Sequence, residues 1–215
     1  MIVRRVGLLG GSFNPAHDGH VHISECALRR LRLDQVWWLV TPQNPLKSVV
    51  GMAPFAERLA AARAFVETPR IVVSDYEARA GTRYTIEALE RLVREHRGKR
   101  FVWLMGADNL MEAHRWRRWT SIFNTVPIAV FARPTYSLRA LSAKAVHRFA
   151  GARVAESQAS ALADMRPPAW VFLNIRLHDA SATRIRAQWD AKRDAKRDTG
   201  TFRGASGKQQ KGSGS

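Results

Sequence analysis

Residues 10–20 read Gly-Gly-Ser-Phe-Asn-Pro-Ala-His-Asp-Gly-His, and this stretch decides how the chain begins to fold. The apolar run at 6–9 before it predicts a buried strand, and apolar side chains at helical spacing follow over 19–31. The stretch is therefore a turn from a strand into a helix. Paired glycines let a backbone approach a bulky anion, and the free N–H groups that begin a helix favour phosphate. If the helix begins near residue 16, His17 and His20 place two imidazoles that can carry positive charge on its first turn.

The same stretch matches the nucleotidyltransferase signature G-x-F-x-P-x-H-x-G-H at all of its fixed positions, which are Gly11, Phe13, Pro15, His17, Gly19 and His20. Other glycine-rich nucleotide motifs, G-x-G-x-x-G and G-x-x-x-x-G-K-[ST], are missing from the chain. A tight turn with two solvated histidines is the structural alternative. Six matched positions between a predicted strand and a predicted helix favour the functional interpretation.

The His-x-x-His spacing also suits zinc, with Asp18 or His22 as a third ligand. A structural zinc site uses four ligands, and the single cysteine, Cys26, adds no thiolate cluster. We therefore expect no metal site built from the chain's own side chains.

The composition indicates one globular protein. A chain of 215 residues with 46% hydrophobic content can bury one substantial core. A single cysteine excludes an internal disulfide framework and suits a reducing compartment. The chain shows neither a secretory signal nor the run of about 20 apolar residues that a membrane helix needs. We expect a soluble, cytoplasmic protein without a membrane partner.

The net charge of +17 indicates an anionic partner. The last segment, 190–215, is basic and rich in Gly and Ser, which predicts a disordered tail behind one domain at 1–189. Whether its last residues are native, and what the tail does, stay open. A nucleic-acid-binding module is the rival to an enzyme, because Arg and Trp interleave at 116–119. Binding nucleic acid without sequence preference does not require fixed histidines, so we disfavour this alternative.

Strand and helix patterns alternate along the chain. Apolar or β-branched runs predict strands at 6–9, 36–40, 71–73, 101–105, 128–131 and 170–173. Helical spacing appears at 19–31, 54–66, 84–95, 109–123 and 142–149, and again from 182. This order predicts an α/β protein with a Rossmann-like fold, in which helices cover both faces of a parallel sheet. Ligands of such sheets bind beyond the carboxyl ends of the strands.

Polar residues follow the predicted strands at that edge. Lys47 ends a loop with two prolines after the second strand, which indicates a placed cation. Gly106 and Asp108 follow the fourth strand, where the carboxylate can accept hydrogen bonds from ribose hydroxyls or cap a helix.

Residues after the sixth strand carry a second signature. Ser181 and Thr183 can cap a helix or, together with Arg186, bind a triphosphate. Their spacing matches Ile-Ser-x-Thr-x-x-Arg, with Ala180 in place of isoleucine. The chain here resembles the bacterial nicotinate-nucleotide adenylyltransferase family, and the resemblance extends from about 6 to 189.

The resemblance implies a nucleotidyltransferase fold and an enzyme that transfers AMP from ATP to nicotinate mononucleotide, with Mg²⁺. The products would be deamido-NAD and pyrophosphate, in NAD biosynthesis. Because the histidine signature is shared, nicotinamide mononucleotide and pantetheine phosphate stay open as acceptors. The sequence leaves the oligomeric state open, a homodimer included.

The resemblance also implies a set of site residues. The catalytic residues would be His17, His20, Lys47 and Arg186. The residues that bind ATP would be Gly10, Gly11, Ser12, Phe13, Gly106, Asp108, Ser181, Thr183 and Arg186. The residues that bind the acceptor would be Asn14, Lys47, Tyr84, Thr85, Trp116 and Arg133. Trp116 would stack on the pyridine ring, and Trp119 would lie on nearly the same helix face toward the core.

Overall fold

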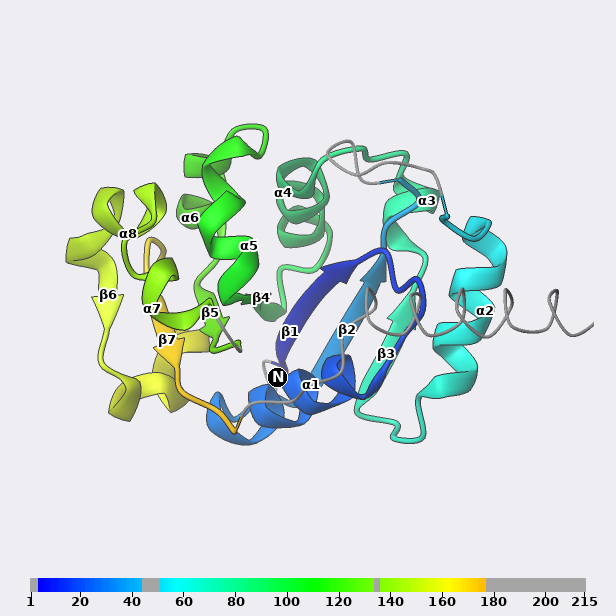
Figure 1. Ribbon diagram of the computed structural model, residues 1–215, viewed down its shortest axis with the longest axis horizontal. Helices are drawn as coiled ribbons and strands as arrows, with labels where there is room; N and C mark the ends of the chain where they lie inside the picture. Colours follow the sequence, from blue (N-terminus) through cyan, green and yellow to red (C-terminus); the bar gives the residue numbers. More distant parts are fainter. Residues whose placement is uncertain (1–3, 44–50, 134–135, 177–215) are drawn as a thin grey trace, which may run out of the picture.

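The described residues of the computed structural model, 4–43, 51–133 and 136–176, contain a seven-stranded sheet of order β3-β2-β1-β4-β5-β7-β6 (Figure 1). Its strands are β1 (Arg4–Gly11), β2 (Gln35–Val40), β3 (Ile71–Ser74), β4 (Lys99–Gly106), β5 (Ile128–Phe131), β6 (Arg153–Val154) and β7 (Trp170–Leu173). All neighbouring strands pair in parallel. The parallel Rossmann-like sheet is confirmed, and so are the six predicted strands. The two-residue β6 at the edge was not predicted, because two residues leave no periodic signal.

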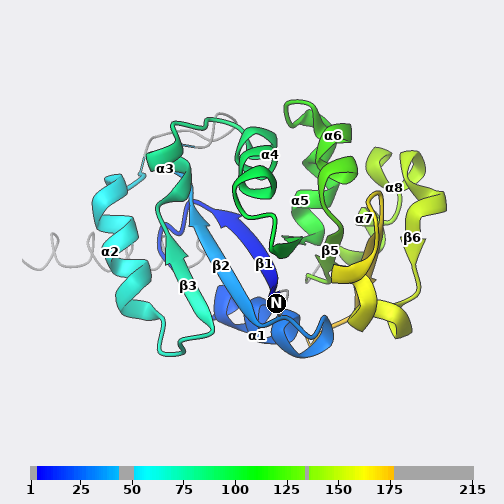
Figure 2. The same ribbon diagram turned by 180° about the vertical axis from the view of Figure 1, so that it is seen from behind.

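Helices cover both faces of this sheet, as Figures 1 and 2 show from opposite sides. The α-helices are α1 (Asp18–Arg30), α2 (Phe55–Phe65), α3 (Tyr76–Ala80), α4 (Thr85–Glu95), α5 (Ala107–Glu112), α6 (Trp119–Thr125), α7 (Ser137–Ala140) and α8 (Lys144–Arg148). Three 3₁₀ segments are η1 (Ala113–Arg115), η2 (Ala150–Ala152) and η3 (Glu156–Asp164). The predicted helix at 142–149 is thus shorter, and the segment from 182 lies outside the described residues.

The central strand β4 shows why two cores form. Its apolar run is continuous, as expected for a parallel strand buried on both faces. Alternate side chains enter opposite clusters: Phe101 and Trp103 join the cluster under α4, α5 and α6, whereas Val102 and Leu104 join the one under α1. The strand pattern therefore fixes which helices lie on which face.

The predicted helix at 109–123 is wrong, because the chain leaves the helical path between α5 and α6. Trp116 is extended, with φ −77° and ψ 145°, and Arg118 has a left-handed φ of 48°. The Arg118 guanidinium forms a two-fold ion pair with Glu90 of α4, at 2.7 and 3.1 Å, which offsets the cost of that backbone. Trp116 and Trp119 consequently share no helix face.

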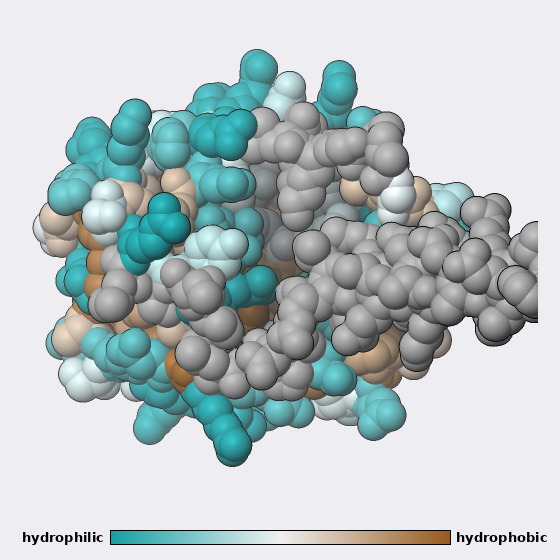
Figure 3. Space-filling view, viewed as in Figure 1, coloured by the Kyte–Doolittle hydropathy of each residue, from teal (hydrophilic) through white to brown (hydrophobic). Residues whose placement is uncertain are grey.

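The molecular surface seen in Figure 3 is largely hydrophilic where its residues are described, and hydrophobic residues occupy small areas. Large exposed apolar side chains within the described ranges are Phe65, Val72, Val93 and Tyr136. Among the helices of these ranges, none is long and apolar enough to cross a membrane.

Gly10 is required by the close approach of Trp103 to β1. A Cβ atom at this position would lie 2.4 Å from Cη2 of the indole. We expect Gly10→Ala to lower the free energy of unfolding by about 1–3 kcal/mol, because the indole must shift within a packed core. Urea denaturation measures this change. Gly98→Ala is the matched control, since nothing lies within 4 Å of its Cβ position. Equal losses in the two variants would contradict this account.

Candidate active site

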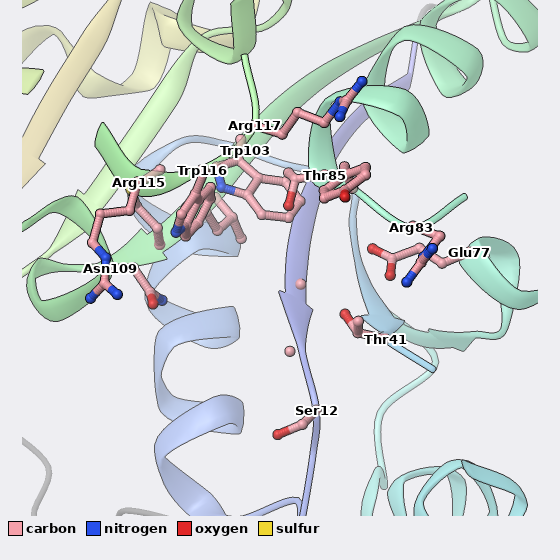
Figure 4. A pocket seen from close by; sticks show the side chains of 15 residues that line it. Ser12, Thr41, Glu77, Arg83, Thr85, Trp103, Asn109, Arg115, Trp116 and Arg117 are labelled. Carbon is pink, nitrogen blue, oxygen red and sulfur yellow. The ribbon is translucent and has the colours of Figure 1, made fainter. Parts of the chain in front are cut away.

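A cavity of about 350 Å³ opens at the carboxyl ends of the central strands (Figure 4). It is lined by residues of β1 and β4, the residue after β2, parts of α3, α4 and α5, and the segment from the end of η1 to residue 117. These residues are Gly10, Gly11, Ser12, Thr41, Glu77, Arg83, Tyr84, Thr85, Trp103, Leu104, Met105, Asn109, Arg115, Trp116 and Arg117. This is the edge at which a parallel sheet binds ligands. Six of the expected site residues meet here, namely Gly10, Gly11, Ser12, Tyr84, Thr85 and Trp116.

His17 and His20 begin α1 as a reciprocal cap. The Gly19 N–H donates to Nδ1 of His17 at 3.1 Å, and the His17 N–H donates to Nδ1 of His20 at 3.2 Å. The helix begins at Asp18, one residue before the predicted span of 19–31, and the two rings meet at a centroid distance of 3.9 Å. Nδ1 of each imidazole accepts a backbone N–H in this arrangement, so Nε2 is the ring nitrogen that can donate. The role of the two histidines as groups that neutralise phosphate charge stays a prediction.

Phe13 packs behind the second histidine. Its ring lies 4.6 Å from that of His20 and stacks on Trp38 at 4.9 Å, and its side chain is 1% exposed. The Trp38 Nε1–H donates to Ser24 Oγ at 2.8 Å, and this hydroxyl donates to the His20 carbonyl at 2.8 Å. The Phe13 ring therefore orients His20. Because this ring is buried, Phe13 can contact a ligand only through its backbone.

Arg58 of α2 was not predicted as a site residue. Its buried guanidinium donates to the carbonyls of Ala53 at 2.9 Å, Ser12 at 2.6 Å, Thr41 at 2.9 Å and Pro42 at 2.7 Å. Burial lowers the pKa of Arg58, yet an arginine stays charged at neutral pH. One side chain thus joins the turn after β1, the loop after β2 and the start of α2.

This arrangement orients peptide groups as well as loops. In a trans peptide the carbonyl and the N–H point in opposite directions. The Ser12 carbonyl accepts a hydrogen bond from Arg58, so the N–H of the same peptide group, which belongs to Phe13, points away from the guanidinium. Asn14 adds a second link, because its Nδ2 donates to the Gly51 carbonyl at 3.0 Å and its Oδ1 accepts from the Ala53 N–H at 3.2 Å. The turn is therefore held from two sides.

The opposite wall of the cavity is aromatic and basic. Tyr84 caps α4 and Thr85 is the first residue of that helix. The guanidinium of Arg117 lies 4.9 Å from the centre of the Tyr84 ring, in cation–π contact. Figure 4 shows Trp116 beside Trp103, between the side chains of Arg115 and Arg117. An aromatic platform with three arginines, Arg83, Arg115 and Arg117, suits an anionic ligand with a flat ring.

Asp108 and Arg133 form a pair over Gly106. Nε of Arg133 lies 3.4 Å from Oδ1 of Asp108, and a Cβ on Gly106 would lie 2.4 Å from that oxygen. Gly106 itself precedes α5 as the capping residue, so the suggested capping role of Asp108 is wrong. The carboxylate lies one residue further, in the first turn of the helix, where its charge is favourable.

Two buried polar groups line the cavity without having been predicted. Glu77 is 6% exposed, and burial raises the pKa of its carboxyl to about 7, against the opposing effect of a hydrogen bond with Thr41. Trp103 is 3% exposed, and its Nε1–H has no partner among the described residues. An acidic residue in a short helix and an aromatic residue in a strand are common, so neither pattern marks a site.

The remaining expected residues cannot be placed. Lys47, Ser181, Thr183 and Arg186 lie outside the described residues, as does the tail at 190–215. Within the described ranges, no group of three or more His, Cys, Asp or Glu side chains could hold a metal ion.

The parallel sheet, with a histidine-capped helix after its first central strand, defines the class of Rossmann-like nucleotidyltransferases. The chain matches the family model described as cytidylyltransferase-like over residues 8–188. It is 57% identical over 182 residues to a probable nicotinate-nucleotide adenylyltransferase of Cereibacter sphaeroides, covering 85% of this chain and 96% of that one. A protein with the same name from Methylorubrum extorquens is 52% identical over 184 residues, 86% of this chain and 100% of the relative. The chain belongs to the nicotinate-nucleotide adenylyltransferase family.

Solved structures agree on the fold. The Plasmodium falciparum nicotinic acid mononucleotide adenylyltransferase complexed with NaAD aligns with a TM-score of 0.65 at 14% identity, over 86% of this chain and 83% of that one. The same enzyme complexed with APC gives a TM-score of 0.63 at 13% identity, with the same coverage.

Arg58→Lys tests the link between the loops. A lysine keeps the charge but cannot reach four carbonyls in the geometry of a guanidinium, so we expect a loss of about 2–4 kcal/mol in the free energy of unfolding. Arg63→Lys on the same helix is the matched control, because the Arg63 side chain is 55% exposed and lies 4.0 Å from its partner Asp75. The control should change stability by less than about 0.5 kcal/mol. Urea denaturation of both variants measures the difference, and similar losses would contradict the assigned role.

Proposed function

We propose that this protein transfers the adenylyl group of ATP to nicotinate mononucleotide, which yields deamido-NAD and pyrophosphate in NAD biosynthesis. The observation that carries the proposal is the cavity that joins the glycine turn of β1 to the aromatic and basic wall around Trp116. One side suits phosphates, and the other suits a flat anionic ring. The names of the relatives supply the identity of the acceptor.

The reaction requires positioning more than covalent chemistry. An oxygen of the acceptor phosphate forms a bond to the α-phosphorus of ATP, while the bond from that phosphorus to the bridging oxygen breaks and pyrophosphate leaves. The nucleophile is already anionic, so no serine, cysteine or strong base is needed. The Nε2–H groups of His17 and His20 would donate to phosphate oxygens as charge shifts during the transfer.

Other residues divide between the two substrates. We propose that the turn of β1 and the Asp108 carboxylate bind ATP, together with Ser181, Thr183 and Arg186 from the second signature. Trp116, Tyr84 and Thr85 bind the ring of the acceptor, and Asn14 and Arg133 belong to the same half of the site. Lys47, which lies outside the described residues, would neutralise charge on the phosphates.

Mg²⁺ would reach the site with ATP. This ion keeps several waters and is commonly held through substrate phosphates and one or two carboxylates, of which Asp108 is the candidate. The ion would supply neutralisation of triphosphate charge, and the chain would supply the orientation of the phosphates. A cytoplasmic location stays a prediction.

The test is pyrophosphate release with ATP and Mg²⁺ and a panel of acceptors: nicotinate mononucleotide, nicotinamide mononucleotide and pantetheine phosphate. We expect nicotinate mononucleotide to be used best. Faster release with pantetheine phosphate would reject the assigned acceptor. No release with any acceptor, together with tight RNA binding that weakens steeply with salt, would favour the nucleic-acid module instead.

His17→Ala and His20→Ala should each lower kcat far more than they raise the KM of the acceptor. Groups aimed at charge that develops in the transition state act mainly on kcat, by about 2–4 kcal/mol each. Steady-state kinetics with both substrates measures the two effects. His22→Ala, on the same helix, is the control and should keep most of kcat. A near-normal kcat in both variants would contradict the assignment.

Trp116→Ala should raise the KM for nicotinate mononucleotide by about one to two orders of magnitude, because one aromatic platform contributes about 1–3 kcal/mol. The KM for ATP should change little. Trp119→Ala is the control, since Trp119 contacts Phe123 and Phe149 and does not line the cavity. It should lower stability and leave both KM values nearly unchanged. An effect of Trp116→Ala on ATP alone would place this ring in the other half of the site.

A further inference from the structure

The wall of the cavity next to Tyr84 and Thr85 contains a buried acid that the proposed chemistry does not use. Glu77 belongs to the short helix α3, and 6% of the residue is exposed. Figure 4 shows its carboxyl directed toward the cavity, above the hydroxyl of Thr41. Thr41 itself is held at the end of β2 by the bond of its N–H to the Gly11 carbonyl at 2.9 Å. The acid is therefore fixed beside the expected ring site.

Of the charged groups near α3, Arg79 and Arg91 have other partners, whereas the Arg83 side chain lies beside that of Glu77 in Figure 4. On α4, Arg91 donates to Glu95 at 2.6 Å and to the Ala80 carbonyl at 2.9 Å. On α3, Arg79 donates to Asp75 at 2.7 Å. The exposed Arg83 shares the cavity rim, and β2 presents the uncharged Thr41. No ion pair joins Glu77 to a residue of the described ranges within 4.0 Å.

The protonation state of this acid changes near neutral pH. Burial raises the pKa of the Glu77 carboxyl to about 7, whereas the Thr41 hydroxyl stabilises the ionised form and opposes the rise. A protonated carboxyl donates one hydrogen bond, and an ionised carboxylate only accepts. The same side chain therefore presents a donor below this pH and an acceptor with negative charge above it.

We propose that Glu77 is a specificity-determining residue of the acceptor site, whose protonated form favours a carboxylate on the pyridine ring and whose ionised form favours a carboxamide. The proposal rests on the proposed function, because it concerns the acceptor of that reaction. A ring carboxylate stays ionised from pH 6 to 8.5 and is repelled by an ionised Glu77. A carboxamide is neutral, and its N–H groups can donate hydrogen bonds to an ionised Glu77.

The ratio of kcat/KM for nicotinate mononucleotide to kcat/KM for nicotinamide mononucleotide isolates this effect. The titration of ATP, of the acceptor phosphate and of residues that contact only these groups is common to both acceptors and cancels in the ratio. For the wild type we expect the ratio to fall about tenfold between pH 6 and 8.5, with a midpoint near 7. An interaction of one pKa unit between Glu77 and the ring carboxylate corresponds to a factor of about ten in this ratio.

Glu77→Gln keeps the shape and cannot ionise, so its ratio should be independent of pH. Thr41→Val removes the hydroxyl that stabilises the ionised form, and its midpoint should move to higher pH. Thr41→Ser keeps the hydroxyl and should restore the wild-type midpoint. Glu57→Gln replaces an exposed acid of α2 and should leave the profile unchanged. If Glu77→Gln does not fold, the shift in Thr41→Val still tests the proposal.

A wild-type ratio that is flat from pH 6 to 8.5 would overturn the proposal, and so would an unchanged slope in Glu77→Gln or an unchanged midpoint in Thr41→Val. These outcomes leave the proposed function intact. Failure to transfer AMP to either mononucleotide at any pH would instead contradict the proposed function itself.

Discussion

The site depends on the guanidinium of Arg58. Where β1 and β2 end, the chain leaves the sheet, and the carbonyls of Ser12, Thr41 and Pro42 no longer face N–H donors of neighbouring strands. A buried carbonyl without a donor costs about 1–3 kcal/mol. The guanidinium has five N–H groups in a rigid plane, and it donates to these three carbonyls and to that of Ala53. It thus stabilises two turns and places a positive charge behind the turn that follows β1.

The orientation of the histidines follows from this contact. Arg58 holds the Ser12 carbonyl, and the next residue, Phe13, has a left-handed φ of 46°, a conformation that costs an ordinary residue about 1–2 kcal/mol. In this conformation the Phe13 ring lies against His20 and Trp38. His20 in turn accepts the His17 N–H, which completes the cap of α1. The buried guanidinium of Arg58 on α2 and the histidine cap of α1 are therefore connected through Phe13.

The fold and the strand-to-helix turn after β1 were predictable from the sequence, because both rest on local patterns. The continuous apolar run of β4 and the fixed positions of the first turn predicted their elements and their place at the sheet edge. The break between α5 and α6 was not predictable, because it depends on the pairing of Arg118 with Glu90, 28 residues away. Arg58 and Glu77 were not predicted as residues of the site for a similar reason. Their sequence neighbours suit ordinary surface helices, and only the tertiary structure buries them.

Part of the excess positive charge of the chain lies at the cavity. The chain has 35 basic and 18 acidic residues, and acids such as Glu90, Glu95, Glu156 and Asp164 are paired with arginines on other parts of the surface. One-to-one pairing must leave basic residues in excess, and Arg83, Arg115 and Arg117 lie at the cavity. A rim of like charge attracts anions and raises their rate of association, an effect that salt weakens. Selection among anions needs something other than this rim, because every substrate that carries phosphate would be attracted alike. Discrimination must come from groups inside the cavity, where the burial of a side chain such as that of Glu77 strengthens its electrostatic effect on a neighbouring group.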